Sequence, residues 1–300
     1  MCSSDLGHPG NDISAVDATT AWAALSSFDE EGGIILHTTD GSKTWLSQDL
    51  PVAIPQGVKG IKGVSRDEAW AVGLDGPVLH TVDGGTTWAV VPTTGVTILQ
   101  VNRMDVLGND IWIADVGNGA NGMIHSPDAG ATWRQESLPG VDPGHGPMTA
   151  TIVDANTAWT TVNQQGDVYR TTDGGLNWLI DAPNASGPND IDDLCATAAD
   201  RTWAVQNISG FSAGHVMFIT VTDTGYEKQS WNFPDYVYEG VTAFDDRNAW
   251  VVGFKTVGAA AELPSGSILH TVNGGVTWMS QTLPVADAAL WKVSFVGAGR

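Results

Sequence analysis

An eight-residue motif recurs along this chain of 300 residues and restricts what it can fold into. In the motif, Asp-x-Gly is a turn sequence, because the carboxylate accepts hydrogen bonds from the following backbone N–H groups and glycine adopts positive φ. Apolar strand residues precede the turn and a tryptophan follows it, which predicts a β-hairpin. The clear copies are TTDGSKTW at Thr38–Trp45, TVDGGTTW at Thr81–Trp88, SPDAGATW at Ser126–Trp133, TTDGGLNW at Thr171–Trp178 and TVNGGVTW at Thr271–Trp278.

The spacing of the motif predicts a propeller. A sixth, worn copy lies around Asp223 and lacks the tryptophan at the expected place. Counted from Asp to Asp, with Asn273 in the last copy, the spacings are 43, 45, 45, 50 and 50 residues. Periods of this size with four short strands are typical of propeller blades. A second tryptophan marks each repeat, at Trp22, Trp70, Trp112, Trp159, Trp203 and Trp250.

Four strands are expected in each repeat. In the second repeat we place them near Ile61–Ser65, Ala69–Gly73, Val78–Thr81 and Thr87–Val91. The first strand of the other repeats is expected at Ile13–Val16, Leu99–Val101, Thr149–Val153, Ile191–Leu194 and Val241–Phe244. Leu290–Phe295 has the pattern of the first strand of a further repeat.

The expected fold class is therefore all-β, a β-propeller of four-stranded antiparallel blades. Six complete repeats plus one strand of a seventh make it six- or seven-bladed. Residues 1–10 are expected to be a non-fold N-terminal segment, a scar or linker, because they have neither the cationic start nor the apolar stretch of an intact signal peptide. Residues 11–300 are expected to form a single propeller domain, truncated at its C-terminus from a longer, seven-bladed protein.

The motif resembles the Asp-box (BNR) repeat of sialidases, sortilin-type receptors and some β-glucan hydrolases. The longer unit at Ala69–Trp88 is most similar to the photosystem II stability/assembly-factor type. That resemblance implies a propeller that acts as a scaffold, with an Arg-rich contact surface in the members that serve photosystem II. Because this chain has only 13 Lys plus Arg, it favours a bacterial relative with a different client.

The charge of the chain limits its partners. A formal net charge of −21 disfavours nucleic acid and anionic lipid, and no apolar run is long enough for a membrane helix. The expected partner is a protein or a surface glycan, with no nucleic acid and no membrane insertion, and the protein is expected to be a monomer. Few lysines, many threonines, glycines, asparagines and tryptophans and an acidic balance favour an extracellular or periplasmic location. The two cysteines do not make a disulfide framework.

The recurring motif residues are expected to be structural, because each aspartate is expected to accept hydrogen bonds from its own turn and the motifs are spread around the ring. Four histidines, at 37, 80, 125 and 270, share one repeat position in different blades, so no metal or other cofactor is expected. The structural set is Asp40, Trp45, Asp83, Trp88, Asp128, Trp133, Asp173, Trp178, Asp223, Asn273 and Trp278.

Two functions of different class remain open. The first is a non-catalytic binding or assembly scaffold. The alternative is a sialidase-like or β-glucan-type glycoside hydrolase that uses acidic loop residues, which needs two carboxylates on opposite sides of a groove. The sequence pairs none of its loop acids, and its seven arginines do not reproduce the arginine triad that the sialidase resemblance implies.

A ligand is expected on the face opposite the Asp boxes. Strand alternation puts the short turns and the boxes on one face, so the variable loops gather on the other, and variable loops on a rigid scaffold carry function. No catalytic residue is assigned. The ligand-binding candidates, chosen as exposed aromatic or acidic loop residues, are Phe28, Asp29, Asp142, His145, Phe211, Phe233, Tyr236, Tyr238 and Glu239.

Overall fold

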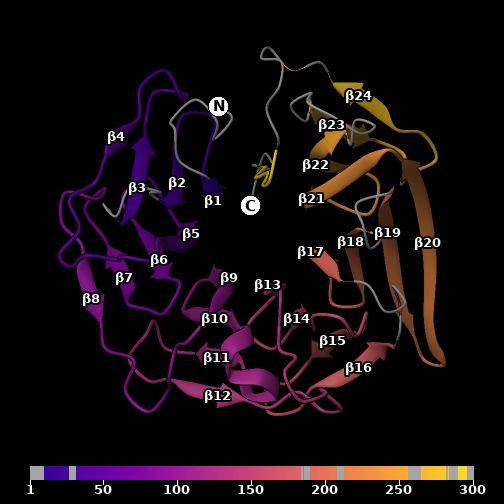
Figure 1. The fold of residues 1–300 in the computed structure, drawn as a ribbon, viewed down its shortest axis with the longest axis horizontal. Coiled ribbons are helices and arrows are strands. Elements are labelled where there is room, and N and C mark those ends of the chain that lie inside the picture. The colour runs from indigo at the N-terminus through magenta and orange to yellow at the C-terminus, as the bar shows by residue number, and fades with distance from the viewer. Residues whose placement is uncertain are drawn as a thin grey trace.

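The predicted propeller is confirmed. The computed structural model describes residues 10–26, 32–183, 185, 190–207, 213–255, 265–281, 283 and 290–295. Within them, six four-stranded antiparallel sheets are arranged as blades around a central channel (Figure 1). The one helical element among these residues is a short 3-10 segment, η2 (Val116–Asn121).

Each blade is made of four consecutive strands, the first next to the axis and the fourth at the outside (Figure 1). Blades 1 to 3 contain β1 (Gly10–Ala15), β2 (Ala21–Ser26), β3 (Gly33–Thr38) and β4 (Leu46–Ser47); β5 (Val58–Gly63), β6 (Ala69–Gly73), β7 (Val78–Thr81) and β8 (Ala89–Val91); and β9 (Val101–Leu107), β10 (Asp110–Asp115), β11 (Met123–Ser126) and β12 (Arg134–Glu136). Blades 4 to 6 contain β13 (Thr151–Ile152), β14 (Ala158–Thr161), β15 (Val168–Thr171) and β16 (Leu179–Ala182); β17 (Ile191–Ala198), β18 (Arg201–Asn207), β19 (Ala213–Thr222) and β20 (Gly225–Pro234); and β21 (Tyr236–Ala243), β22 (Ala249–Lys255), β23 (Ser265–Thr271) and β24 (Met279–Gln281).

The first strand of blade 3 differs from expectation. It was expected at Leu99–Val101, but β9 begins at Val101. The amides of Leu99 and Gln100 donate instead to the carboxylate of the buried Asp115, at 2.6 and 2.9 Å. A side chain thus satisfies these two amides and removes them from the ladder.

Blade 5 does not form the worn Asp box expected at Asp223. Its last two strands are long, and Thr222 pairs directly with Gly225 across a two-residue turn. The box aspartate needs a longer turn whose amides return to its carboxylate, and a two-residue hairpin has no such amides. Trp231 of β20 packs 5.7 Å from Trp203 and gives this blade its aromatic contact in another way.

The core consists mainly of layers between neighbouring blades. In blades 1, 2, 3 and 6 the tryptophan of the second strand stacks on the histidine of the third strand, as the buried Trp22 does on His37 at 3.6 Å. The box of the next blade covers it: Trp88 meets Trp22 edge-on at 5.8 Å. In blade 4, Arg170 replaces the histidine and lies over Trp159, 5.3 Å from the ring centre. The repeat tryptophans therefore join blade to blade.

Leu290–Phe295 lies between blade 6 and blade 1 (Figure 1). The Leu290 amide donates to the Gly253 carbonyl at 3.3 Å, and the Ser294 hydroxyl accepts from the Ala15 amide at 3.0 Å. Phe295 stacks on Trp250 at 4.2 Å. The segment thus connects the two blades that meet across the start and end of the described chain.

Because neighbouring strands in a blade are antiparallel, the two ends of the channel differ. We call the end with the Asp boxes and the turns between first and second strands the box face. The opposite end, with the loops between second and third strands and between blades, is the loop face. All five clear boxes lie on the box face, at the turn between third and fourth strands.

Candidate functional site

The box aspartates are occupied by their own turns. Oδ1 of Asp83 accepts from the Thr87 amide at 2.9 Å, and its Oδ2 accepts from the Thr87 hydroxyl at 2.7 Å. Hydrogen bonds from Thr44 lower the pKa of Asp40 to about 2. Asn273 contacts the same two groups of Thr277: its Oδ1 accepts from the Thr277 amide, and its Nδ2 donates to the Thr277 hydroxyl, in both cases at 2.9 Å. Each box carboxylate is therefore hydrogen-bonded within its own turn and stabilises its hairpin.

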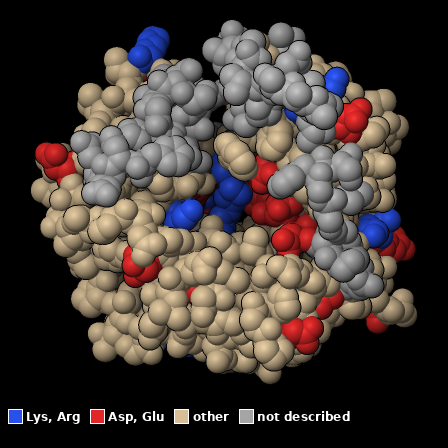
Figure 2. Space-filling view, in the orientation of Figure 1, with Lys and Arg blue, Asp and Glu red and all other residues tan. Residues whose placement is uncertain are grey.

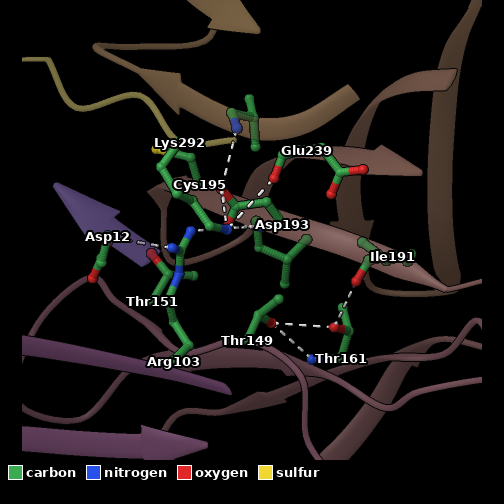
Figure 3. A network of polar contacts seen from close by, with 12 residues as sticks. Asp12, Arg103, Thr149, Thr151, Thr161, Ile191, Asp193, Cys195, Glu239 and Lys292 are labelled. Carbon is green, nitrogen blue, oxygen red and sulfur yellow. Dashed lines mark hydrogen bonds and ion pairs between the residues drawn. The ribbon is translucent and has the colours of Figure 1, made fainter. Parts of the chain in front are cut away.

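The channel between the blades holds a network of charges that the sequence did not reveal. The guanidinium of Arg103 spans from Asp12 of blade 1, at 3.4 Å, to Asp193 of blade 5. Nζ of Lys292 lies 3.6 Å from the Asp193 carboxylate (Figure 3). These four residues, the charged ring, come from three first strands and the Leu290–Phe295 segment. Figure 2 shows cationic and acidic side chains side by side in the central opening.

Strand alternation explains why these side chains share the channel. Residues at every second position of a strand lie on the same side, so Asp12 with Ser14 and Arg103 with Asp105 line it together. One step nearer the box face, Lys62 pairs with Asp105 at 2.7 Å. The charged side chains therefore form layers inside the propeller.

Burial and pairing set the protonation of the ring. Burial pushes the pKa of Asp193 upward, but the charges of Arg103 and Lys292 outweigh it and hold that pKa below its ordinary value. Burial raises the pKa of Asp12, against the opposing charge of Arg103. Burial also lowers the pKa of Lys292. The ring is a compensated buried network in which the loss of one member strands its partners.

A pair of carboxyl groups lies at the loop-face end of the channel. Nδ2 of Asn207 donates to Asp192 at 3.1 Å and to Glu239 at 3.5 Å, so both acids share one amide. Both sit at irregularities of their first strands, where a β-bulge redirects a side chain. Burial, with the nearby charges of Glu239 and Asp190, raises the pKa of Asp192 to about 8. Burial likewise raises the pKa of Glu239.

A groove of about 780 Å³ opens on the loop face between blades 3 and 4. Its walls carry amide side chains and glycines, which present hydrogen-bond donors and acceptors without charge. Asp190 lies at the edge of the groove. Its negative charge helps to raise the pKa of Asp192, so the groove and the carboxyl pair are coupled electrostatically. The uncharged polar side chains of the lining are Gln100, Asn102, Asn118 and Asn163.

Three aromatic candidates are strand residues and not free loop residues. β20 ends at Pro234 and β21 begins at Tyr236, so the expected loop contracts to Asp235, which has φ of 67°. Tyr238 is fully buried, Phe233 meets its ring at 5.4 Å, and Tyr236 stacks on it at 6.1 Å. Their expected role as exposed ligand contacts is wrong for Tyr238, because the long hairpin of blade 5 draws this segment into the core.

The other candidates separate into three groups. Asp142 and His145 lie in the connection between blades 3 and 4, next to the groove wall at Gly144 and Met148, and the His145 amide donates to the Asp142 carbonyl at 3.1 Å. Glu239 belongs to the carboxyl pair with Asp192. Phe28, Asp29 and Phe211 lie outside the described residues.

The residues that sequence reasoning missed are those of the channel: Asp12, Arg103, Asp192, Asp193 and Lys292. Their signal was present, because the first strand of a blade lies next to the axis, so a charged side chain on its inner side faces the channel. Among the residues that the structure describes, no group of three or more His, Cys, Asp or Glu is placed to hold a metal ion. No helix of the same residues is long and apolar enough to cross a membrane.

The fold and its boxes define an Asp-box propeller with a charged channel. Residues 53–232, more than half of the chain, match the model of a family described as photosynthesis system II assembly factor YCF48. The chain belongs to this family. No curated protein sequence matches it.

Solved structures with the same fold include YCF48 structures and a GH74 glycoside hydrolase. A structure titled YCF48 bound to D1 peptide is 15% identical, with a TM-score of 0.64, covering 91% of this chain and 81% of the other. YCF48 from Cyanidioschyzon merolae is 16% identical, also with 0.64, covering 94% and 87%. The GH74 xyloglucanase from Xanthomonas campestris is 13% identical with 0.64, and the match covers 92% of this chain but 45% of the enzyme. At these identities the likeness concerns the fold.

Proposed function

We propose that the protein is a non-catalytic assembly scaffold that binds an extended segment of a client protein on its loop face. The observation that supports this most is the amide-lined groove between blades 3 and 4. Uncharged amides and glycines match the alternating N–H and C=O groups of an extended peptide, as in other modes of backbone recognition. The solved relative with a D1 peptide is itself a peptide-bound propeller.

The charge of the chain bears on the identity of the client. A net charge of −21 favours a client segment that is neutral or cationic around the groove. We further propose that the protein acts as a monomer outside the cytoplasm, in an extracellular or periplasmic space, which its composition favours. Fractionation of cells that express the complete gene tests the location, and sedimentation of the purified protein tests the monomer.

A peptide-binding experiment tests the scaffold role. The probe is an immobilised library of unstructured dodecapeptides, and the variant is Gln100→Ala with Asn118→Ala on the groove wall. The matched control is Arg66→Ala with Asp67→Ala and Glu68→Ala on the box face. Loss of peptide signal in the groove variant alone supports the proposal. Loss in the control alone, or no peptide bound by the unaltered protein, contradicts it.

The glycoside hydrolase stays as the second candidate because one observation favours it. Asp192, with its pKa raised to about 8, and Glu239 resemble an acid and a base held close together. Against this, Asn207 bonds both carboxyls, whereas an inverting pair leaves room for a water. Turnover of β-glucans or sialosides that Asp192→Asn abolishes would establish the enzyme. A glycan held without turnover would replace the protein client by a sugar.

A further inference from the structure

The box-face end of the channel carries apolar side chains around its opening, in contrast to the charged layers above it. Several first strands end there, and the residue two positions beyond the polar channel residue lines the opening, as Val64 follows Lys62 and Leu107 follows Asp105. Val64, Leu107, Phe244 and Phe295 are 38% to 46% exposed. We call the residues that surround this opening the apolar rim: Val16, Val64, Leu107, Val153, Phe244 and Phe295.

The rim surrounds a real cavity. The space inside it measures about 650 Å³, which lies within the range of ~300–1,000 Å³ of ligand-binding pockets. Its floor is the layer of Lys62, Asp105 and Thr151, where Lys62 and Asp105 already neutralise each other. The walls therefore offer apolar contact, and the floor closes the channel without an uncompensated charge at that layer.

Acidic residues border the rim. Asp17, Asp154 and Asp245 directly follow the rim residues Val16, Val153 and Phe244 in the chain. Hydrogen bonds from Thr19 lower the pKa of Asp17 to about 2, so this charge persists in mildly acidic solution. Arg201, one of the cations of the same turns, is already paired with Asp200 and Asp246. The box aspartates add further negative charge to the same face.

We propose that the apolar rim is a second docking site, and that its occupant is a partner-protein segment with large apolar side chains flanked by lysine or arginine. Exposed apolar patches on soluble proteins mark interaction sites, and the negative border selects the sign of the partner. Apolar side chains of the segment enter the cavity, and its cations face Asp17, Asp154 and Asp245. This site lies on the face opposite the proposed peptide groove and does not depend on it, so the two sites together would let the propeller bridge two proteins.

A labelled octapeptide with two leucines between pairs of lysines is the probe, measured by fluorescence anisotropy. Leu107→Ser with Phe244→Ser is expected to weaken binding at least tenfold. Leu46→Ser with Leu179→Ser, exposed apolar residues on outer strands, is the matched control and is expected to bind as the unaltered protein does. Replacing the lysines by glutamates is expected to abolish binding, whereas the groove variant Gln100→Ala with Asn118→Ala is expected to retain it.

Several results would overturn the proposal. They are equal binding by the rim variant, equal binding of a peptide with serines in place of the leucines, and no binding by the unaltered protein at millimolar peptide. Concentration-dependent dimers that the rim variant abolishes would make a second copy the occupant instead. Val64→Thr keeps the shape of the side chain and is expected to weaken binding about threefold. It provides the same test if the double variant melts early.

Discussion

At the scale of single residues, the box tryptophan contributes more to stability than its position at the edge of a turn implies. Trp88 is 6% exposed and packs across the blade boundary against Trp22. Trp88→Ala is therefore expected to cost about 3–5 kcal/mol of unfolding free energy, measured by urea titration. A loss close to zero would show that the neighbouring blade does not depend on the box.

The box aspartate allows a finer comparison. Asp83→Ala removes the acceptor of the Thr87 amide and hydroxyl and is expected to lower the melting temperature. Asp83→Asn is expected to lower it less, because Asn273 already makes the equivalent bonds to Thr277. If both variants melted at the same temperature, the charge and not the hydrogen bonding would be what the turn requires.

Asp192 gives a pH dependence with a definite sign. Its pKa is raised from 3.8 to about 8 on folding, so the folded state holds a proton that the unfolded state releases above pH 4. The contribution of Asp192 to stability is thus greatest below pH 4 and falls as pH rises toward 8, by an amount on the order of a few kcal/mol. The Asp192→Asn variant is expected to lose this fall. Melting temperatures of both proteins at pH 5 and pH 8 measure the difference, and parallel curves would contradict it.

At the scale of elements, the second glycine of the box is a contact between blades. A methyl group at Gly175 would lie 2.4 Å from the Trp112 ring of the preceding blade, whereas one at Gly174 would meet only Ala155 O at 3.5 Å. Both glycines have positive φ, so their comparison isolates the clash. Blade 3 already carries Ala129 at the first position, with φ of 54°.

We therefore expect Gly175→Ala to destabilise the protein by ~1–3 kcal/mol more than Gly174→Ala does, because the added methyl group overpacks the layer between blades. The unfolding free energies of the two variants give the answer. A larger effect at Gly174 would mean that backbone strain, and not the approach of the neighbouring blade, limits this position.

Much of this element-level design could be read from the sequence. β6 and β7 begin and end where the pattern placed them, at Ala69–Gly73 and Val78–Thr81, because tryptophan and turn residues bracket both strands. The first strands were harder, since Asp115 takes up the amides just before β9. Tyr238 was predicted to be exposed but is buried, because the length and packing of the blade 5 hairpin depend on tertiary structure that the local sequence does not show. The partners of Arg103 come from distant repeats, which no local pattern reveals.

At the scale of the whole molecule, Arg103 joins opposite sides of the ring. Arg103→Met would leave Asp12 buried without its ion-pair partner and Asp193 with Lys292 alone, and is expected to cost about 3–5 kcal/mol. Adding Asp12→Asn to the same chain, which leaves Asp193 paired with Lys292, is expected to restore part of that loss. Urea unfolding of the single and double variants measures both steps. If the double variant were the less stable of the two, the network would stabilise the fold beyond mere compensation.

The seam between blades 1 and 6 has a consequence for the order of folding events. The bond between Ala15 and Ser294 joins residues 279 positions apart, whereas the equivalent bond from Gly63 to Ser14 spans 49. Closing the longer loop costs more chain entropy and gives contacts that are gained late. Neighbouring blades can thus pack together one after another into an open arc. Contact between blades 6 and 1 then forms last. A chaperone or a protease would bind the chain in this open state, in which the contact surfaces of blades 1 and 6 are still exposed.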